Sequence, residues 1–196
     1  GGYYSEISKY FGNGYPIRDV DIKQFGITLA KSQNLWCKEV HFFTAPPYQS
    51  ENPNQEEIER RKNYDKWVYK VKKIPDLHIH EGRCQFIDGE YHQKAVDTLV
   101  VMELLELCKS KAIKTFVLLA CDTDFVPLLN KLRNDGFQII LFYFTDKQRK
   151  SKFSMSNHIL TACDRKVLIT KECFLRSVKN NEVVTRNRQL ILSPEI

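Results

Sequence analysis

The sequence lacks any hydrophobic run long enough to cross a membrane. Its longest apolar stretch covers residues 137–144 and is interrupted by Gln138, whereas a membrane-spanning helix needs about 20 apolar residues. The first residues also lack the apolar segment that follows a basic one in a secretory signal. We therefore expect a cytoplasmic protein with no membrane partner.

Paired cysteines, internal repeats and low-complexity tracts are also absent from the sequence. The six cysteines are scattered and form no C-x-x-C pair, so neither a disulfide framework nor a cysteine-based zinc cluster is expected. Free thiols fit a reducing compartment.

Composition indicates one folded domain with a basic surface. The 196 residues are 42% hydrophobic and 28% charged, which is typical of a globular chain of single-domain size. We expect residues 1–178 to form this domain and the polar residues 179–196 to form a weakly packed tail. The 30 Lys and Arg residues against 24 Asp and Glu residues give a net charge of +6, which favours a polyanionic partner such as RNA.

Hydrophobic patterning predicts an α/β class with a central parallel sheet flanked by helices. Residues 116–121 and 137–144 are almost continuously apolar, as strands buried on both faces of a parallel sheet must be. Residues 125–135 between them are expected to form a helix that Gly136 ends, which gives a right-handed βαβ unit. The other expected elements are helices at 19–31, 55–71, 94–109 and 156–163, and strands beginning at 40 and at 77–80 and 166–170.

Two histidines alternate along the expected strand at 77–80. His78 and His80 have a spacing that can place both imidazoles on one strand face. A metal site needs further ligands, and none follows at a recognisable spacing. We therefore favour an exposed strand face over a metal site for these two residues.

Two carboxylates follow the buried strand at 116–121. Asp122 and Asp124 lie in the turn at its carboxyl end, where open α/β sheets bind ligands. Two neighbouring carboxylates are costly to ionise together unless a cation or hydrogen-bond donors compensate them. The pattern predicts a divalent-metal site. In the alternative, Asp124 or Thr123 caps the next helix, which leaves Asp122 unexplained.

Asp97 is a third candidate metal ligand. On the expected helix at 94–109 it lies within about 40° of Val101 and Leu104, so it should point inward with the apolar stripe. A favourable helix-dipole interaction of about 0.3–1 kcal/mol is the alternative explanation, but it does not account for an inward direction. If the helix begins at the same sheet edge as Asp122 and Asp124, three carboxylates converge on Mg²⁺ or Mn²⁺.

These residues also carry a family resemblance. Lys94-Ala-Val-Asp97 and Ala120-Cys-Asp122-Thr-Asp124-Phe125 resemble the K-G-V-D and S-G-D-S-D-F motifs of the NYN family of PIN-like ribonucleases. Further matches occur in order at residues 42–47, 81–83 and 156–164. The resemblance implies a three-layer PIN-like sandwich and metal-dependent cleavage of RNA phosphodiester bonds. It implies that Asp97, Asp122 and Asp124 hold Mg or Mn.

The sequence departs from the family pattern at three places. Family members begin with an apolar strand that ends in an acidic residue, whereas this sequence opens at Gly1-Gly2-Tyr3. We therefore expect that strand and the first carboxylate to be missing from the sequence given. Ala95 replaces the usual glycine, and Ala120-Cys121 replaces Ser-Gly. We interpret both as mild changes that the backbone tolerates.

Basic residues beside the acidic ones are candidate RNA contacts. A loop leaves the strand at 137–144 from its carboxyl end, so its cations are expected at the same rim as the acids, where they could hold phosphates; a solvated loop is the alternative. Lys94, beside Asp97, is a further candidate, and Thr123 could orient a water molecule or satisfy a backbone amide. The loop cations are Lys147, Arg149, Lys150 and Lys152.

Two other functions remain open on the sequence. A haloacid-dehalogenase-like phosphatase also places a D-x-D pattern after a hydrophobic strand and forms a phospho-aspartate, although that motif normally lies near the N-terminus. A catalytically silent RNA-binding or protein-interaction module of the same fold is the second alternative. We favour a ribonuclease acting on single-stranded RNA, and the sequence leaves a homodimer open.

Overall fold

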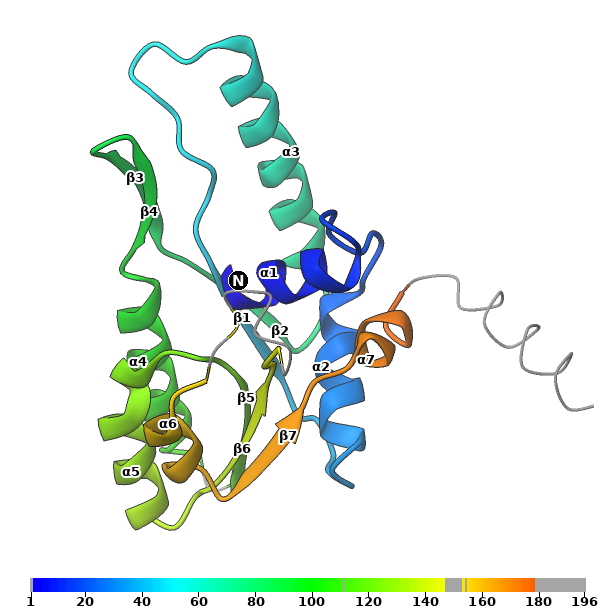
Figure 1. Ribbon diagram of the computed structural model, residues 1–196, viewed down its shortest axis with the longest axis vertical. Coiled ribbons are helices and arrows are strands. Elements are labelled where there is room, and N and C mark those ends of the chain that lie inside the picture. The colour runs from blue at the N-terminus through cyan, green and yellow to red at the C-terminus, as the bar shows by residue number, and fades with distance from the viewer. Residues whose placement is uncertain (1, 111, 147–152, 154, 179–196) are drawn as a thin grey trace, which may run out of the picture.

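Figure 1 shows the computed structural model of the chain, which describes residues 2–110, 112–146, 153 and 155–178. The helices are α1 (Gly2–Phe11), α2 (Ile22–Lys31), α3 (Gln55–Val71), α4 (Val96–Leu107), α5 (Val126–Asn134), α6 (Asn157–Thr161) and α7 (Lys171–Leu175), with a short 3₁₀ turn η1 (Thr123–Phe125). The strands are β1 (Val40–Thr44), β2 (Leu77–Glu81), β3 (Arg83–Ile87), β4 (Glu90–Lys94), β5 (Thr115–Leu119), β6 (Gln138–Tyr143) and β7 (Arg165–Leu168).

The parallel strands form two sheets with helices on both sides. Strands β5, β6 and β7 pair in that order, all parallel, and β1 pairs with β2 in parallel. Helices α4, α5 and α6 lie on one side of β5–β6–β7, and α2 and α7 lie on the other (Figure 1). This confirms the predicted α/β class with parallel strands between helices, although the parallel strands form two sheets and not one.

Strand β6 is the centre of the core because both of its faces are covered. Ile139 and Leu141 pack into a cluster with α5 and α6, while Ile140 and Phe142 pack into another with α1, α2 and α7. All four are at most 1% exposed. This two-sided burial is why the sequence of β6 is continuously apolar and does not alternate.

The β3–β4 hairpin is an element that the sequence analysis missed. The two strands are antiparallel and are joined by Asp88 and Gly89, which have φ angles of 51° and 83°. Positive φ at both turn residues is the geometry that Asp-Gly favours in a two-residue hairpin. As a result Lys94 ends β4, and the helix that was expected from residue 94 begins at Val96.

The β1–β2 pair has a small core of its own. Val40, Phe42 and Ile79 pack on one face against a cluster that includes Ile22 of α2 and Val71 of α3. On the other side of β1, a cavity of about 350 Å³ is lined by residues of both β1 and β5. Both strands are edges of their sheets, and an edge strand has backbone groups that a further strand could pair.

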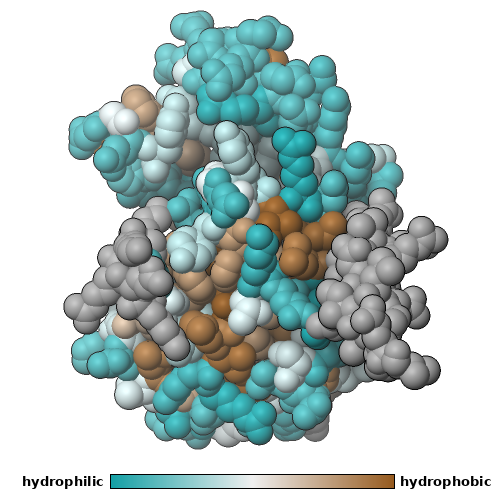
Figure 2. All heavy atoms as spheres, turned by 45° about the vertical axis from the view of Figure 1, so that its right-hand side comes forward, coloured by the Kyte–Doolittle hydropathy of each residue, from teal (hydrophilic) through white to brown (hydrophobic). Residues whose placement is uncertain are grey.

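Helix α3 stands away from the body of the molecule and is largely polar. Figure 2 shows hydrophilic residues over this upper part and hydrophobic residues gathered on the body below it. The helix begins with a reciprocal capping pair, in which the Asn54 side chain accepts from the N–H of Glu57 and the Glu57 carboxylate accepts from the N–H of Asn54. Among the residues that the structure describes, no helix is long and apolar enough to cross a membrane.

Candidate functional site

Asp122 caps the short turn that follows β5. Its Oδ1 accepts a hydrogen bond from the N–H of Asp124, with 2.9 Å between oxygen and nitrogen. The capping interpretation was therefore wrong about the residue, because Asp122, and not Asp124 or Thr123, is the N-cap of η1. Capping accounts for one oxygen of Asp122 and leaves its other oxygen available for a ligand.

Thr123 and Asp124 are exposed at the start of η1, immediately beyond the carboxyl end of β5. The turn is held in place by Phe125, which is buried in the core cluster shared with α5 and α6. Because Phe125 fixes one end of the turn and Asp122 caps the other, the backbone presents both residues to solvent at the sheet edge.

Asp97 lies in the first turn of α4 and is exposed. Asp97 lies on the same stripe as Leu104, which is buried two turns later, but at the first turn of α4 this stripe is exposed and not buried as we expected. Ala95, the residue before α4, has a left-handed φ of 65°. This conformation costs a residue with a Cβ about 1–2 kcal/mol, which explains why glycine suits the position better and why the replacement is less mild than we interpreted.

The three carboxylates share one electrostatic neighbourhood. Partial burial and the negative charges of Asp122 and Asp124 raise the pKa of Asp97 above its ordinary value. The pKa of the Cys121 thiol is raised by burial and by the charges of Asp122 and Asp97. Repulsion of this kind requires the acids of η1 and α4 to lie near one another, so the start of α4 and the carboxyl end of β5 meet at the same edge.

The acidic groups are arranged more loosely than a closed metal cluster. In the described part of the chain, the sets of three ligand atoms that lie within 4.8 Å of one another are formed by His and Glu residues and do not include Asp97, Asp122 or Asp124. A loose arrangement still suits Mg²⁺, which keeps several water ligands and binds through one or two carboxylates.

The predicted RNA contacts are placed only in part. Lys94 is exposed at the end of β4, two residues before α4 begins. Lys147, Arg149, Lys150 and Lys152 lie outside the described residues, so their position at the rim stays a prediction.

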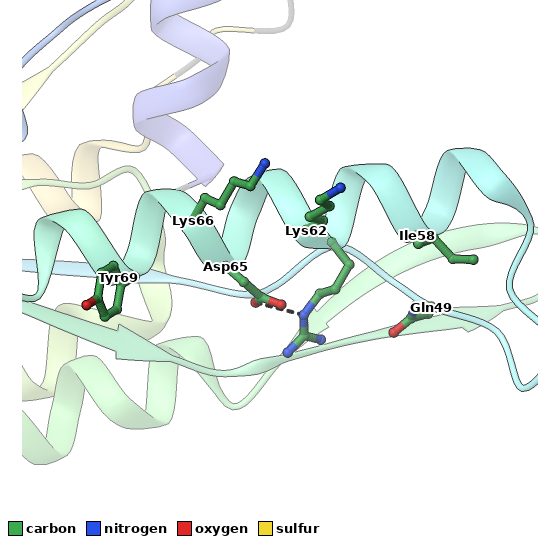
Figure 3. A pocket seen from close by; sticks show the side chains of 7 residues that line it. Gln49, Ile58, Lys62, Asp65, Lys66 and Tyr69 are labelled. Atoms are coloured by element: carbon green, nitrogen blue, oxygen red, sulfur yellow. Dashed lines mark hydrogen bonds and ion pairs between the residues drawn. The ribbon is translucent and has the colours of Figure 1, made fainter.

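A second basic surface, which we call the α3 groove, lies along α3 (Figure 3). Lys62 and Lys66 project from neighbouring turns, and Arg61 forms an ion pair with Asp65 at 3.0 Å. Tyr69 is 64% exposed beside them. The groove is lined by Gln49, Ile58, Arg61, Lys62, Asp65, Lys66 and Tyr69.

A histidine cluster is the feature that sequence reasoning missed. Parallel pairing places His41 of β1 opposite His78 of β2, and His41 Nδ1 lies 3.0 Å from Nε2 of His80. His41 is therefore a further potential ligand, brought to His78 and His80 by strand pairing and not by a recognisable spacing in the sequence. Of the pair on β2, only His78 has the exposed position that we expected, because His80 is 19% exposed.

Comparison with known proteins identifies the family. The model of the NYN domain matches residues 10–169. The chain belongs to the NYN domain family. This membership confirms the resemblance carried by the motifs around Asp97 and Asp122, and it gives the chain a nuclease-like fold.

Two individual proteins are similar to this NYN domain. Uncharacterized protein y4oD of Sinorhizobium fredii is 37% identical over 68 residues, which are 35% of this chain and 32% of that protein. The alignment therefore spans about a third of the relative. The crystal structure of a protein of unknown function, VPA0982 from Vibrio parahaemolyticus, has a TM-score of 0.52 at 10% identity and covers 87% of this chain and 89% of its own. At that identity the likeness concerns the fold alone.

Proposed function

We propose that this NYN domain is a metal-dependent ribonuclease that cleaves phosphodiester bonds in single-stranded RNA. One observation carries the proposal: partial burial, together with the negative charges of Asp122 and Asp124, raises the pKa of Asp97. Three acids from two separate elements thus repel one another at the carboxyl edge of the sheet, where α/β folds bind ligands. Membership of a family with a nuclease-like fold supports the same reaction class.

The residues at this edge suit Mg²⁺ or Mn²⁺. Carboxylate oxygens are the ligands that both ions prefer, and a divalent cation would offset the repulsion that contributes to the raised pKa of Asp97. Asp97, Asp122 and Asp124 would hold the ion. When bound, it supplies Lewis-acid chemistry for the attack of water on the scissile phosphate.

The remaining residues have roles in binding and orientation. Thr123 is exposed and lies between Asp122 and Asp124 in the sequence, and its hydroxyl would orient the attacking water by a hydrogen bond. Lys94 would neutralise a phosphate of the RNA, and the loop cations Lys147, Arg149, Lys150 and Lys152 would hold the neighbouring phosphates. No residue of the chain needs to form a covalent intermediate in this reaction.

Metal-dependent cleavage of single-stranded RNA tests the proposal. We expect an end-labelled RNA to be cleaved in Mg²⁺ or Mn²⁺, the cleavage to stop on addition of EDTA and to return with excess metal. Cleavage that resists EDTA contradicts the metal dependence. RNA binding without cleavage would identify a silent module, and turnover of a phosphate monoester with transient phosphorylation of Asp122 would identify a phosphatase.

The salt dependence of RNA binding locates the phosphate contacts. We expect Arg149→Ala combined with Lys150→Ala to flatten the slope of log K against log[salt] by about 1.4, since each lost contact with a single strand removes about 0.7. Lys62→Ala combined with Lys66→Ala removes the same charge from the α3 groove and should leave the slope unchanged. The reverse pattern would move the RNA-binding surface to α3.

A further inference from the structure

One face of the β1–β2 pair carries polar side chains where the opposite face carries the small core. Side chains alternate between the two faces of a strand, so Val40 and Phe42 point into the apolar core while His41 lies between them on the other face. On β2 the same alternation places His78 and His80 on the side of His41. Helix α4 covers this face and contributes Glu103.

Three potential metal ligands meet on this face. His41 Nε2 and His78 Nε2 lie 3.8 Å and 3.5 Å from the same oxygen, Oε2 of Glu39. The ligand atoms of these three residues all lie within 4.8 Å of one another. Neighbouring ligands of a tetrahedral zinc ion are about 3.3 Å apart, given Zn–N and Zn–O bonds of about 2.0–2.1 Å. The three atoms could therefore close on one ion through small side-chain movements.

The Nε2 atom of His41 indicates which side of the ring the ion would occupy. This nitrogen is buried and has no hydrogen-bond partner in the described structure, a condition that costs about 1–3 kcal/mol. The other ring nitrogen, Nδ1, lies 3.0 Å from Nε2 of His80 and 3.4 Å from Oε1 of Glu103. A histidine that binds metal through one nitrogen usually donates the other N–H to a carboxylate or a similar acceptor, which fixes the ring.

We propose that Glu39, His41 and His78 bind a zinc-type divalent cation, with His80 and Glu103 as positioning residues for His41. Two imidazoles and a carboxylate form a donor set that holds zinc with one coordination position open. The 350 Å³ cavity, which Glu39, His41 and Glu103 help to line, gives room for a water molecule or a ligand at that position. His78 is 48% exposed and gives the ion a path from solvent.

This site is separate from the proposed ribonuclease site and does not depend on it. The two share no residue, and Glu103 follows Asp97 by six residues on α4, which is about 9 Å along a helix. The donor atoms also differ: imidazole nitrogens suit zinc, whereas the carboxylates at the sheet edge suit Mg²⁺ or Mn²⁺.

Titration of the purified, untagged NYN domain with Co²⁺ or Zn²⁺ alone tests the site. We expect one ion per chain to give the visible absorption of tetrahedral Co²⁺, which distinguishes it from any ion held by the carboxylates at the sheet edge, and calorimetry gives its affinity. His78→Ala and Glu39→Gln each remove a ligand and should weaken binding by more than about 100-fold, whereas Glu103→Gln should weaken it by about 10–100-fold. The exposed His158 of α6 provides the control, because His158→Ala should bind as the wild type does.

Several results would overturn the proposal. These are the absence of saturable binding by the wild type, binding that survives in His78→Ala, and loss of binding in His158→Ala. If His80→Ala loses Co²⁺ binding and His78→Ala keeps it, the ion lies on the other side of the His41 ring. This result would also contradict the assignment of Glu39, His41 and His78 as ligands. Asp122→Asn should bind Co²⁺ normally, so failure of the ribonuclease proposal leaves this measurement valid.

Discussion

Asp122→Asn is expected to abolish metal-dependent RNA cleavage without destabilising the fold. The asparagine side chain keeps an oxygen that can accept the N–H of Asp124, which Asp122 Oδ1 now accepts at 2.9 Å, and asparagine is as good an N-cap as aspartate. It removes the negative charge that the metal requires. We expect the cleavage rate at saturating Mg²⁺ to fall by about 100-fold or more. The melting temperature in EDTA should not fall below that of the wild type, because the substitution also relieves the repulsion between Asp122 and Asp97.

Asp122→Ala separates the two roles of this residue. Alanine removes both the charge and the cap, so we expect the same loss of cleavage together with a loss of stability of about 0.5–2 kcal/mol. Asp135→Asn is the matched control, because it removes an exposed carboxylate at the far end of α5 from η1. If Asp122→Asn cleaves RNA at the wild-type rate, the charge of Asp122 takes no part in the reaction. If it unfolds as readily as Asp122→Ala, that charge stabilises the fold.

The sequence predicts best the elements that are defined by local pattern. Strands β5 and β6 were predicted because two-sided burial makes their apolar character continuous, and α5 because Gly136, at a φ of 88°, ends it where the pattern stops. The Asp-Gly signal of the β3–β4 hairpin was also local, but no element was predicted between the strand at 77–80 and the helix at 94–109.

Contacts between distant segments could not be predicted in the same way. The meeting of His41 with His78 depends on the register of two parallel strands, and their approach to Glu103 depends on which sheet face α4 covers. Neither is determined by spacing within one segment. Both V-H-F-F-T and L-H-I-H-E have a histidine at the second position, next to apolar residues. This similarity is the signal that could have suggested that the histidines share one face of the paired strands.

Asp97 illustrates the limit of a helical-wheel argument. The angle between Asp97 and Leu104 gives a direction around the helix axis, but it contains no information on how deeply each turn of α4 is buried. Helix α4 covers the sheet at Leu104 and emerges at its first turn, so the same stripe is buried at one end and exposed at the other. Asp97 lies near Asp122 and Asp124 because of how the fold places α4, which a helical wheel cannot predict.

Asp97→Asn is expected to reduce RNA cleavage by about 100-fold or more and, in EDTA at neutral pH, to raise the melting temperature. A pKa raised in the folded state means that ionised Asp97 destabilises the fold, after any favourable helix-dipole contribution is included. The increase in melting temperature should be complete above the pKa of Asp97 in the folded state and should shrink as the pH falls. It should vanish below the ordinary aspartate pKa of about 3.9, where Asp97 is neutral like the asparagine that replaces it.

Divalent metal should reverse this difference in stability. Mg²⁺ or Mn²⁺ that binds only the folded wild type raises its melting temperature, and the response should be much smaller in Asp97→Asn because one ligand has lost its charge. Glu106→Gln, on the exposed face of the same helix, should keep the wild-type response to metal. A melting temperature of Asp97→Asn in EDTA below that of the wild type, with RNA cleavage intact, would show that Asp97 stabilises the start of α4 and takes no part in metal binding.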